Sequence, residues 1–586
     1  MPRLLAPVLA VSLASAYQLD TVIPVPMRAP SECAHGCAAW ADLAGSHNTA
    51  RQAAVDALWA DAVAERGAGA SCAIPANWGV PQGAVCYCRG TASAPTSAWG
   101  ICSEPDVPTP QQVNLQYGAS GTELQVAWVT ADRGAPLVRA PLVELCAEGA
   151  PCVNVSGAST RAPEPQLPSR VLTFSLVPLP AAATAAGARF TYRALPGTAA
   201  AAWSRVFSVA TPAAGATQTL AIFGDQGLYP YSSVGNLIDD AKRGWAAGGI
   251  QGVVHLGDLA YNMAMSNGTR GDAYMYALEP LLSSVPWLSA EGNHELEGSP
   301  SISPSLSPPS LLPHPPVSLP LPQGSPFGVY CPLAEDCESR YLKQIAGYLV
   351  AGRASGSGTN RYFSLDVGLL HVVVFNTMNY LGLGENVRAK QLAWLEEDLR
   401  KASAPEQRAR VPWILVASAS PCAPPPPSSH PLSPTPHLRS LAPLPFAAHV
   451  PMYCSAVGQT GVGGDSRADI EPLLLSASVD LYMYGHVHSY EATWPVGPDG
   501  AVAAQSYINP RAPVHVLTGA GGPPGSPDTY PATRPVWSRA NYSSWSFGRL
   551  QVFNATHLTF SQLDNVAGAV VDSFTIVQEG RAKRFQ

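Results

Sequence analysis

Five short motifs carry side chains that could bind metal ions, and each follows a stretch with the composition of a β-strand. In chain order they are Gly224-Asp225-Gln226-Gly227, Gly257-Asp258-Leu259-Ala260-Tyr261, Gly292-Asn293-His294-Glu295, His449-Val450-Pro451-Met452-Tyr453 and Gly485-His486-Val487-His488. Glycine lets the backbone bend tightly at such strand ends. As ligands, these motifs supply two Asp, one Asn, one Tyr and three of their four His, enough for two metals that share one carboxylate, with positions left open for water and substrate.

Each motif alone is weak evidence, because a Gly-Asp pair usually marks a turn. A single histidine inside an apolar strand is more often a core residue than a ligand, and we assign His255 and His371 to the core. Gly-His-x-His is more informative, because alternate strand residues face apart unless the loop folds them onto one centre. Five such motifs in order at strand ends therefore argue for a functional metal site.

A layered α/β domain would bring these strand ends together. Over residues 213–586, apolar strands end in glycine-rich loops and are followed by helical stretches, of which 387–402 is the clearest. In sheets of this kind, sites form at the carboxyl ends of the strands. We therefore predict that residues 213–586 form the catalytic domain.

Three segments precede that domain. Residues 1–16 have the basic start, apolar run and small-residue cleavage site of a signal peptide. Residues 17–104 contain six cysteines and one predicted helix over 48–65, and we favour a disulfide-linked structural cap over a ligand-binding module or a zinc site. Short alternating strands over 105–212 predict a small all-β sandwich, in which Cys146 and Cys152 could close a local loop.

Proline is unusually abundant, at 58 of 586 residues, and concentrates in two segments, 299–324 and 418–447. Such segments form neither helix nor sheet, and long structureless loops are unusual inside a compact domain. They are either surface insertions or untranslated sequence retained in the gene model. Removing the second segment joins the strand at 413–417 directly to Ala448-His449, which favours the latter. Either insertion could distort the site, because they lie next to His294 and His449.

Composition limits the partners and the compartment. The net charge of −7 argues against a nucleic-acid binder that relies on a basic surface. No stretch after the signal peptide reaches the roughly 18 apolar residues that span a bilayer, so we expect a soluble, secreted protein without stable membrane association; vacuolar or lysosomal delivery stays open. Twelve cysteines fit an oxidising compartment. N-glycans are predicted at four sequons, which begin at Asn154, Asn267, Asn541 and Asn554.

Taken together, the motifs closely resemble those of the purple acid phosphatases, a branch of the calcineurin-like metallophosphoesterases. The resemblance covers roughly residues 105–580 and includes the closing segments 513–521 and 547–558. It implies a layered β-sandwich flanked by helices for the catalytic domain, preceded by a fibronectin-III-like domain over 105–212. The Pro-Met-Tyr-Cys run after His449 is more similar to the animal-type long form than to the plant form.

One position separates this branch from its relatives. Most metallophosphoesterases have Asp-x-His in the first motif, whereas Gly227 stands at that third position here. Tyr261 supplies a phenolate instead, and a hard anionic phenolate favours Fe(III). This favours a purple acid phosphatase over a nucleotidase or a cyclic-nucleotide phosphodiesterase.

The resemblance implies a role for each residue. Fe(III) would be held by Asp225, Tyr261 and His488. The divalent metal (Zn, Mn or Fe) would be held by Asn293, His449 and His486, with Asp258 bridging both ions. His294 would contact phosphate or help protonate the leaving group, so Asp258 and His294 are the implied catalytic residues. The implied activity is a secreted acid phosphatase that hydrolyses small-molecule phosphate monoesters by attack of a metal-bound hydroxide.

Two alternatives stay open. The same centre could serve a phosphodiesterase or pyrophosphatase, or the chain could be an inactive secreted binding glycoprotein in which the Cys-rich module does the work. The insertions favour the hypothesis of an inactive binding protein, and the intact ligand set argues against it. The stretch 455–461 lacks the histidine pair of the plant-type enzymes. Without the second insertion Cys454 would be left unpaired, and Cys331 and Cys337 are close enough in sequence to pair.

Overall fold

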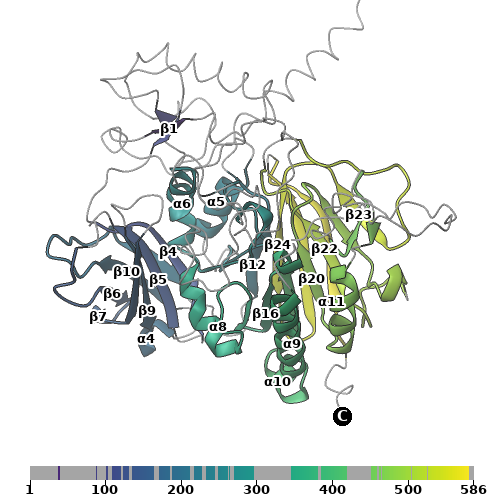
Figure 1. Cartoon of the computed structure of the whole chain (residues 1–586), viewed down its shortest axis with the longest axis horizontal. Helices are drawn as coiled ribbons and strands as arrows, with labels where there is room; N and C mark the ends of the chain where they lie inside the picture. The colour runs from purple at the N-terminus through teal and green to yellow at the C-terminus, as the bar shows by residue number, and fades with distance from the viewer. Residues whose placement is uncertain are drawn as a thin grey trace, which may run out of the picture.

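The structure of the protein is a computed structural model (Figure 1). It describes residues 109–295, 345–418 and 451–579, apart from short gaps, together with three short strands nearer the N-terminus. The gaps are 120–122, 131–134, 164–170, 185–187, 211–216, 228–231, 244–248, 262, 264–268, 381–384, 458–460, 463–464, 503, 524–525 and 566. Among the described residues, no helix is both long and apolar enough to cross a membrane.

Several predicted features lie outside the described residues. They are the signal peptide 1–16, the helix 48–65, the sequon at Asn267, the pair Cys331 and Cys337, His449, and the insertions 299–324 and 418–447 beyond Ser418. Within the Cys-rich module, the structure describes one antiparallel sheet in the order β1-β3-β2. Its strands are β1 (Cys37–Ala39), β2 (Tyr87–Cys88) and β3 (Gly100–Cys102).

The strands between residues 111 and 210 form two facing sheets. One consists of β4 (Gln111–Tyr117), β5 (Glu123–Thr130), β8 (Ala158–Pro163) and β9 (Val171–Pro178). The other, in the order β11-β10-β6-β7, consists of β6 (Leu142–Ala147), β7 (Val153–Val155), β10 (Arg189–Leu195) and β11 (Phe207–Ala210). Residues of both sheets, among them Leu115, Trp128 and Phe190, share one buried core. A disulfide joins Cys146 to Cys152. The predicted all-β sandwich is present, and its fibronectin-III-like character stays a prediction.

The predicted catalytic domain is built on two further groups of strands. The first comprises β12 (Gln218–Phe223), β13 (Val253–His255), β14 (Trp287–Ser289), β24 (Ser546–Val552), β25 (His557–Asp564) and β26 (Val570–Val577). The second, in the order β15-β16-β17-β20-β22-β21-β23, comprises β15 (Phe363–Val367), β16 (Leu370–Phe375), β17 (Trp413–Ser418), β20 (Leu481–Tyr484), β21 (Tyr490–Thr493), β22 (Val514–Thr518) and β23 (Ser538–Tyr542).

The two sheets pack face to face, and helices cover their outer faces. Because strand residues alternate between faces, Val372 and Val374 of β16 enter the core between the sheets, whereas Val373 and Phe375 enter the core under the helices. The helices over the seven-stranded sheet include α9 (Glu385–Ala402), α10 (Pro405–Arg410) and α11 (Asp465–Ser476). Helices α5 (Val234–Arg243) and α6 (Thr269–Leu282) pack against the other sheet. The predicted layered β-sandwich flanked by helices is confirmed.

The β-sandwich is joined to the catalytic domain by hydrogen-bonded strands. Strand β4 pairs in parallel with β14, so one sheet of ten strands runs through both regions in the order β26-β25-β24-β12-β13-β14-β4-β5-β9-β8. Figure 1 shows the purple and blue sandwich strands beside the teal and yellow catalytic strands. The sequence pattern predicts separate units on either side of residue 212 and does not reveal this continuity.

Parallel pairing places the motifs at one edge of the molecule. Strands β12, β13 and β14 run parallel to one another, as do β16, β17, β20 and β22. Their carboxyl ends lead directly into the segments 224–227, 257–261, 292–295 and 485–488. The fold therefore brings together four of the five motifs, and the fifth begins outside the described residues.

Candidate metal centre

The motif loops approach one another so closely that glycine is needed at two positions. A Cβ atom on Gly485 would lie 2.5 Å from Oδ2 of Asp225, and a Cβ atom on Gly292 would lie 2.2 Å from Oδ1 of Asp258. Neither distance is compatible with a real side chain. The glycines thus let each neighbouring loop pass directly over a carboxylate of the site.

Four predicted ligands also have an uncommon backbone conformation. The φ angles of Asp225, Asp258, Tyr261 and His486 are 57°, 55°, 53° and 77°. These are four of the seven non-glycine residues with positive φ in the described part of the chain. Such a conformation costs energy and concentrates at functional sites, where the surrounding structure holds it in place. The clustering marks these loop ends as functional.

Asp225, Tyr261 and His488 form one group of potential ligands. The phenol oxygen of Tyr261 lies 3.2 Å from Oδ1 of Asp225 and 3.0 Å from Nε2 of His488. The carboxylate oxygen and the imidazole nitrogen are 3.5 Å apart. Ligands at right angles around an ion, each about 2.1 Å from it, lie about 3 Å apart. These three side chains therefore have the spacing of groups that share one ion.

Asn293, His486 and Asp258 form a second group beside the first. Oδ1 of Asn293 lies 2.9 Å from Nδ1 of His486, and that nitrogen lies 4.0 Å from Oδ2 of Asp258. The backbone N–H of His486 donates to Oδ2 of Asp225 at 2.6 Å, which links the two groups. Both carboxylates thus lie between the two sets of neutral ligands.

The electrostatics of the site call for cations. Asp225 and Asp258 are 0% and 2% exposed, and within the described part of the chain neither pairs with a lysine or arginine. Burial, reinforced by the nearby Asp258 carboxylate, raises the pKa of Asp225 well above its usual range. Burial, with a contribution from His294, lowers the pKa of His488 to about 3, so its ring is neutral and able to bind a metal. Two buried carboxylates among neutral oxygen and nitrogen ligands fit metal ions.

The remaining predicted site residues are His294 and His449. The ring of His294 packs 4.5 Å from the ring of Tyr261, and its backbone N–H donates to Oδ1 of Asp258 at 2.9 Å. His294 is half-buried, so it borders the ligands and remains partly open to solvent. His449 lies outside the described residues. The segment that follows it is fixed, because Tyr453 is fully buried and its carbonyl accepts the hydroxyl of Tyr484 at 2.7 Å.

Three acidic residues that the sequence analysis did not single out hold the site loops. Asp528 accepts the backbone N–H of His488 at 2.7 Å, and Glu491 accepts that of Ser455 at 2.7 Å. Glu295 accepts the backbone N–H groups of Asp258, Leu259 and Gly292. Burial and the charge of Asp258 raise the pKa of Glu295, whereas the three backbone N–H groups favour its ionised form and oppose that shift. Of these three residues, only Glu295 could have been recognised from the sequence, because it ends the third motif. Asp528 and Glu491 belong to no motif, and only the fold brings them to the site loops.

The two histidines assigned to the core have different surroundings. His255 is buried, and its ring accepts the N–H of Gly257 at 3.2 Å, as a neutral core residue can. His371 is also buried but lies between two carboxylates, 2.7 Å from Asp366 and 3.1 Å from Asp398. Burial alone would favour its neutral form, yet these hydrogen bonds prevail and raise the pKa of His371 to about 9. It is therefore a buried cation, which the core assignment did not anticipate.

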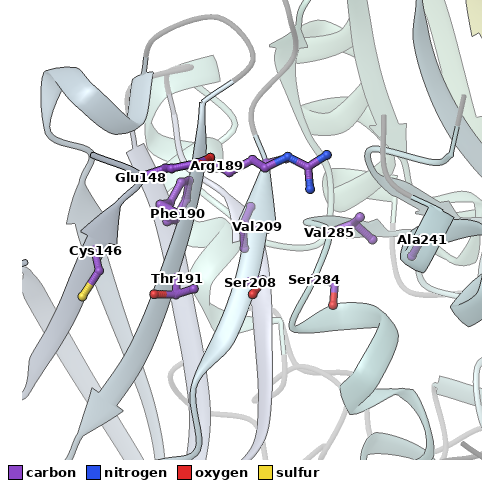
Figure 2. A pocket seen from close by; sticks show the side chains of 11 residues that line it. Cys146, Glu148, Arg189, Phe190, Thr191, Ser208, Val209, Ala241, Ser284 and Val285 are labelled. Carbon is purple, nitrogen blue, oxygen red and sulfur yellow. The ribbon is translucent and has the colours of Figure 1, made fainter. Parts of the chain in front are cut away.

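A cavity of about 590 Å³ lies apart from these ligands, between the β-sandwich and the catalytic domain. Figure 2 shows Phe190 and Val209 of the sandwich on one side and Ala241 and Val285 on the other, with the side chain of Arg189 extending between them. Val285 precedes β14, whereas the third motif follows that strand. The cavity thus opens at the opposite edge of the sheet from the metal ligands, and none of those ligands lines it.

Comparison with known proteins agrees with the fold and the motifs. The family described as calcineurin-like phosphoesterase matches residues 219–490, and the family described as iron/zinc purple acid phosphatase-like protein C matches residues 512–573. Acid phosphatase type 7 of Homo sapiens is 26% identical over 526 residues, which cover 84% of this chain and 96% of the relative. Purple acid phosphatase 18 of Arabidopsis thaliana is 26% identical over 355 residues, 60% of each chain.

A solved structure supports the same architecture. The purple acid phosphatase isolated from yellow lupin (Lupinus luteus) seeds superposes with a TM-score of 0.56 at 20% identity, covering 84% of this chain and 79% of that one. The paired sheets, with the predicted ligands at their strand ends, have the metallophosphoesterase fold. Within that class, the chain resembles the purple acid phosphatase-like branch of the calcineurin-like phosphoesterases in both family matches and in its curated relatives, as the motifs predict.

Proposed function

We propose that this protein is a secreted acid phosphatase that hydrolyses phosphate monoesters with a centre of Fe(III) and a divalent metal. The observation that carries the proposal is the division of the described ligands into two adjacent groups around the carboxylates of Asp225 and Asp258. One group contains a phenol and the other does not, which supports two unlike ions. Purple acid phosphatases are enzymes with a binuclear centre of iron and a second metal.

Each ion would be held by its own residues. Asp225, Tyr261 and His488 would hold Fe(III); Asn293, His486 and His449 would hold the divalent ion; and Asp258 would bridge them. When bound, such a pair supplies a hydroxide nucleophile at acidic pH and neutralises charge on the phosphoryl oxygens. A mixed carboxylate, phenol, amide and imidazole set is consistent with both ions.

His294 would act on the substrate rather than on a metal. Its backbone is anchored to Asp258 and its ring rests against Tyr261, which together fix its position beside both ligand groups. Because the ring is partly exposed, it can hydrogen-bond a phosphoryl oxygen or give a proton to the departing alkoxide oxygen. Either role lowers the cost of the negative charge that develops during ester cleavage.

We also propose secretion and glycosylation. The apolar N-terminus is consistent with a signal peptide, and the sequon residues Asn154 and Asn554 are exposed while Asn541 is half-buried. These positions are accessible to glycan attachment on a secretory route. Mass spectrometry of the secreted protein after glycosidase treatment would test each site separately.

The experiment that tests the function compares substrates and pH. The secreted protein, purified with its metals, is assayed with p-nitrophenyl phosphate and with bis(p-nitrophenyl) phosphate between pH 4 and pH 8. The proposal predicts that monoester hydrolysis exceeds diester hydrolysis and is fastest below pH 7. Asp258→Asn serves as the inactive control, because it weakens both metal positions. A diester preference would favour the phosphodiesterase alternative, and full activity of Asp258→Asn would overturn the bridging assignment.

A further inference from the structure

Glu295 connects two of the motif loops through its side chain. It is 3% exposed, and its carboxylate accepts three backbone N–H groups. Oε2 accepts from Asp258 at 2.7 Å and from Gly292 at 2.8 Å, and Oε1 accepts from Leu259 at 2.8 Å. The first and third of these residues follow β13, and the second follows β14. One side chain therefore joins the ends of two neighbouring strands.

The connection is reciprocal. Glu295 holds the backbone of Asp258, and Oδ1 of Asp258 in turn accepts the backbone N–H of His294 at 2.9 Å. The two motifs thereby close a ring of hydrogen bonds through two carboxylates. Asp258 has a φ of 55°, a conformation that needs external support. The ring supplies that support at the residue proposed to bridge the two ions.

The contacts of Glu295 distinguish it from a ligand or a proton donor. Both of its oxygens already accept backbone N–H groups at 2.7–2.8 Å. Hydrogen bonds to a carboxylate are stronger than neutral ones, so separating it from these donors is costly. A buried carboxylate whose two oxygens already accept hydrogen bonds acts on the site only through the residues that it holds.

We propose that Glu295 is a positioning residue that sets the Asp258 carboxylate in place before metal binds. This inference rests on the proposed metal centre and goes beyond it, because it assigns metal retention to a side chain that touches no metal. Residues that orient metal ligands typically change metal affinity by about 10–100-fold when they are replaced. Loss of Glu295 should therefore weaken metal binding by a similar factor, in addition to any loss of stability.

Two variants and a matched control test the inference. Glu295→Gln keeps the size of the side chain but turns an N–H₂ group toward backbone donors that need an acceptor. Glu295→Asp keeps both acceptors but is one methylene shorter, so it cannot reach both loops. Asp480→Asn is the control: Asp480 is also 3% exposed and accepts a backbone N–H, that of Ile414 at 2.9 Å, together with Arg408 at 2.9 Å. Asp480 precedes β20, whereas the predicted ligands His486 and His488 follow that strand, so Asp480 lies at the strand end away from the metal site.

The measurement is equilibrium binding of Zn²⁺ to the metal-free full chain, by competition with a chelator, together with the thermal unfolding midpoint with and without Zn²⁺. Both Glu295 variants should weaken Zn²⁺ binding about 10–100-fold and shrink the increase in midpoint that Zn²⁺ produces. Asp480→Asn should lower the midpoint of the metal-free protein and leave the Zn²⁺ affinity unchanged. A loss of stability without a change in Zn²⁺ affinity would overturn the inference, and Glu295→Asp answers the question if Glu295→Gln does not fold.

The outcome also separates this inference from the proposed function. If the parent protein binds Zn²⁺ and the Glu295 variants bind it weakly, the positioning role stands even when no phosphatase activity is found. If the parent protein is an active phosphatase and the variants bind Zn²⁺ normally, the function stands and the positioning role falls. A parent chain that binds no metal would overturn both.

Discussion

At the scale of single residues, the site depends on backbone groups as much as on ligands. The N–H groups of Asp258, His294, His486 and His488 all donate to carboxylates of the site or its supports. The motif pattern predicts the ligands, because their types and spacing carry the chemistry. It does not predict Asp528 or Glu491, because an isolated acidic residue has no signal until the fold brings it to a loop.

Close approach of the loops gives a prediction at Gly485. A methyl group there would lie 2.5 Å from Oδ2 of Asp225 and would displace that carboxylate. Because a shift of about 1 Å in a reacting group can cost about 100-fold in rate, Gly485→Ala should lower kcat for p-nitrophenyl phosphate by about that factor. Gly497→Ala is the control, since its nearest neighbour is 3.6 Å away. Equal kcat values for the two variants would contradict the described packing.

At the scale of secondary-structure elements, most of what the sequence predicts comes from the alternation of apolar and polar residues and from the order of the strands along the chain. The helix predicted over 387–402 is present as α9 (Glu385–Ala402), and the strand predicted over 413–417 is present as β17 (Trp413–Ser418), which extends one residue into the segment predicted as an insertion. The pairing of β4 with β14 has no such signal, because parallel pairing joins segments far apart in the sequence. The charge of His371 is likewise missed, because Asp398 reaches it from a different element, α9.

The ion pairs of His371 give a prediction about pH. Its ring lies between Asp366 of β15 and Asp398 of α9, with Gln407 and Arg410 of α10 also facing Asp366. Its pKa is raised to about 9, above the usual 6.5, so its stabilising charge is fully present below pH 6.5 and is lost as pH rises through 9. His371→Gln should thus lower the free energy of unfolding by about 3–5 kcal/mol near pH 6 and by less above pH 9.

Urea unfolding at several pH values would measure this difference. The exposed His557 provides the control, because His557→Gln removes an imidazole that has no buried ion pair in the described structure. A His371→Gln penalty that is the same at pH 6 and pH 10 would show that the contribution comes from packing rather than from charge.

At the scale of the whole molecule, the β-sandwich and the catalytic domain share buried polar contacts. Glu279 of α6 accepts the backbone N–H of Val113 at 3.0 Å and pairs with Arg205 at 2.6 Å. The hydroxyl of Tyr192 donates to the carbonyl of Ser283 at 2.8 Å. These contacts and the continuous sheet make the sandwich part of the support for α6 and β14, and hence for the third motif.

Removal of Glu279 should therefore affect more than the sandwich. Glu279→Ala leaves the buried N–H of Val113 without an acceptor, at a cost of about 1–3 kcal/mol. We expect a lower unfolding midpoint in urea and weaker cooperativity between sandwich and catalytic domain. Glu144→Ala is the matched control, because Glu144 pairs with Arg193 on the partly exposed face of the sandwich, where an ion pair contributes at most about 1 kcal/mol. Equal effects of the two variants would contradict the coupling.

The central claim, a mixed iron centre with a tyrosine ligand, is tested most directly by the visible absorption spectrum of the purified secreted protein. The structure places the phenol oxygen of Tyr261 3.2 Å from Asp225 and 3.0 Å from His488. We predict a tyrosinate-to-Fe(III) charge-transfer band that disappears in Tyr261→Phe, with one iron and one divalent ion per chain by elemental analysis. A colourless parent protein that contains no iron would contradict the account.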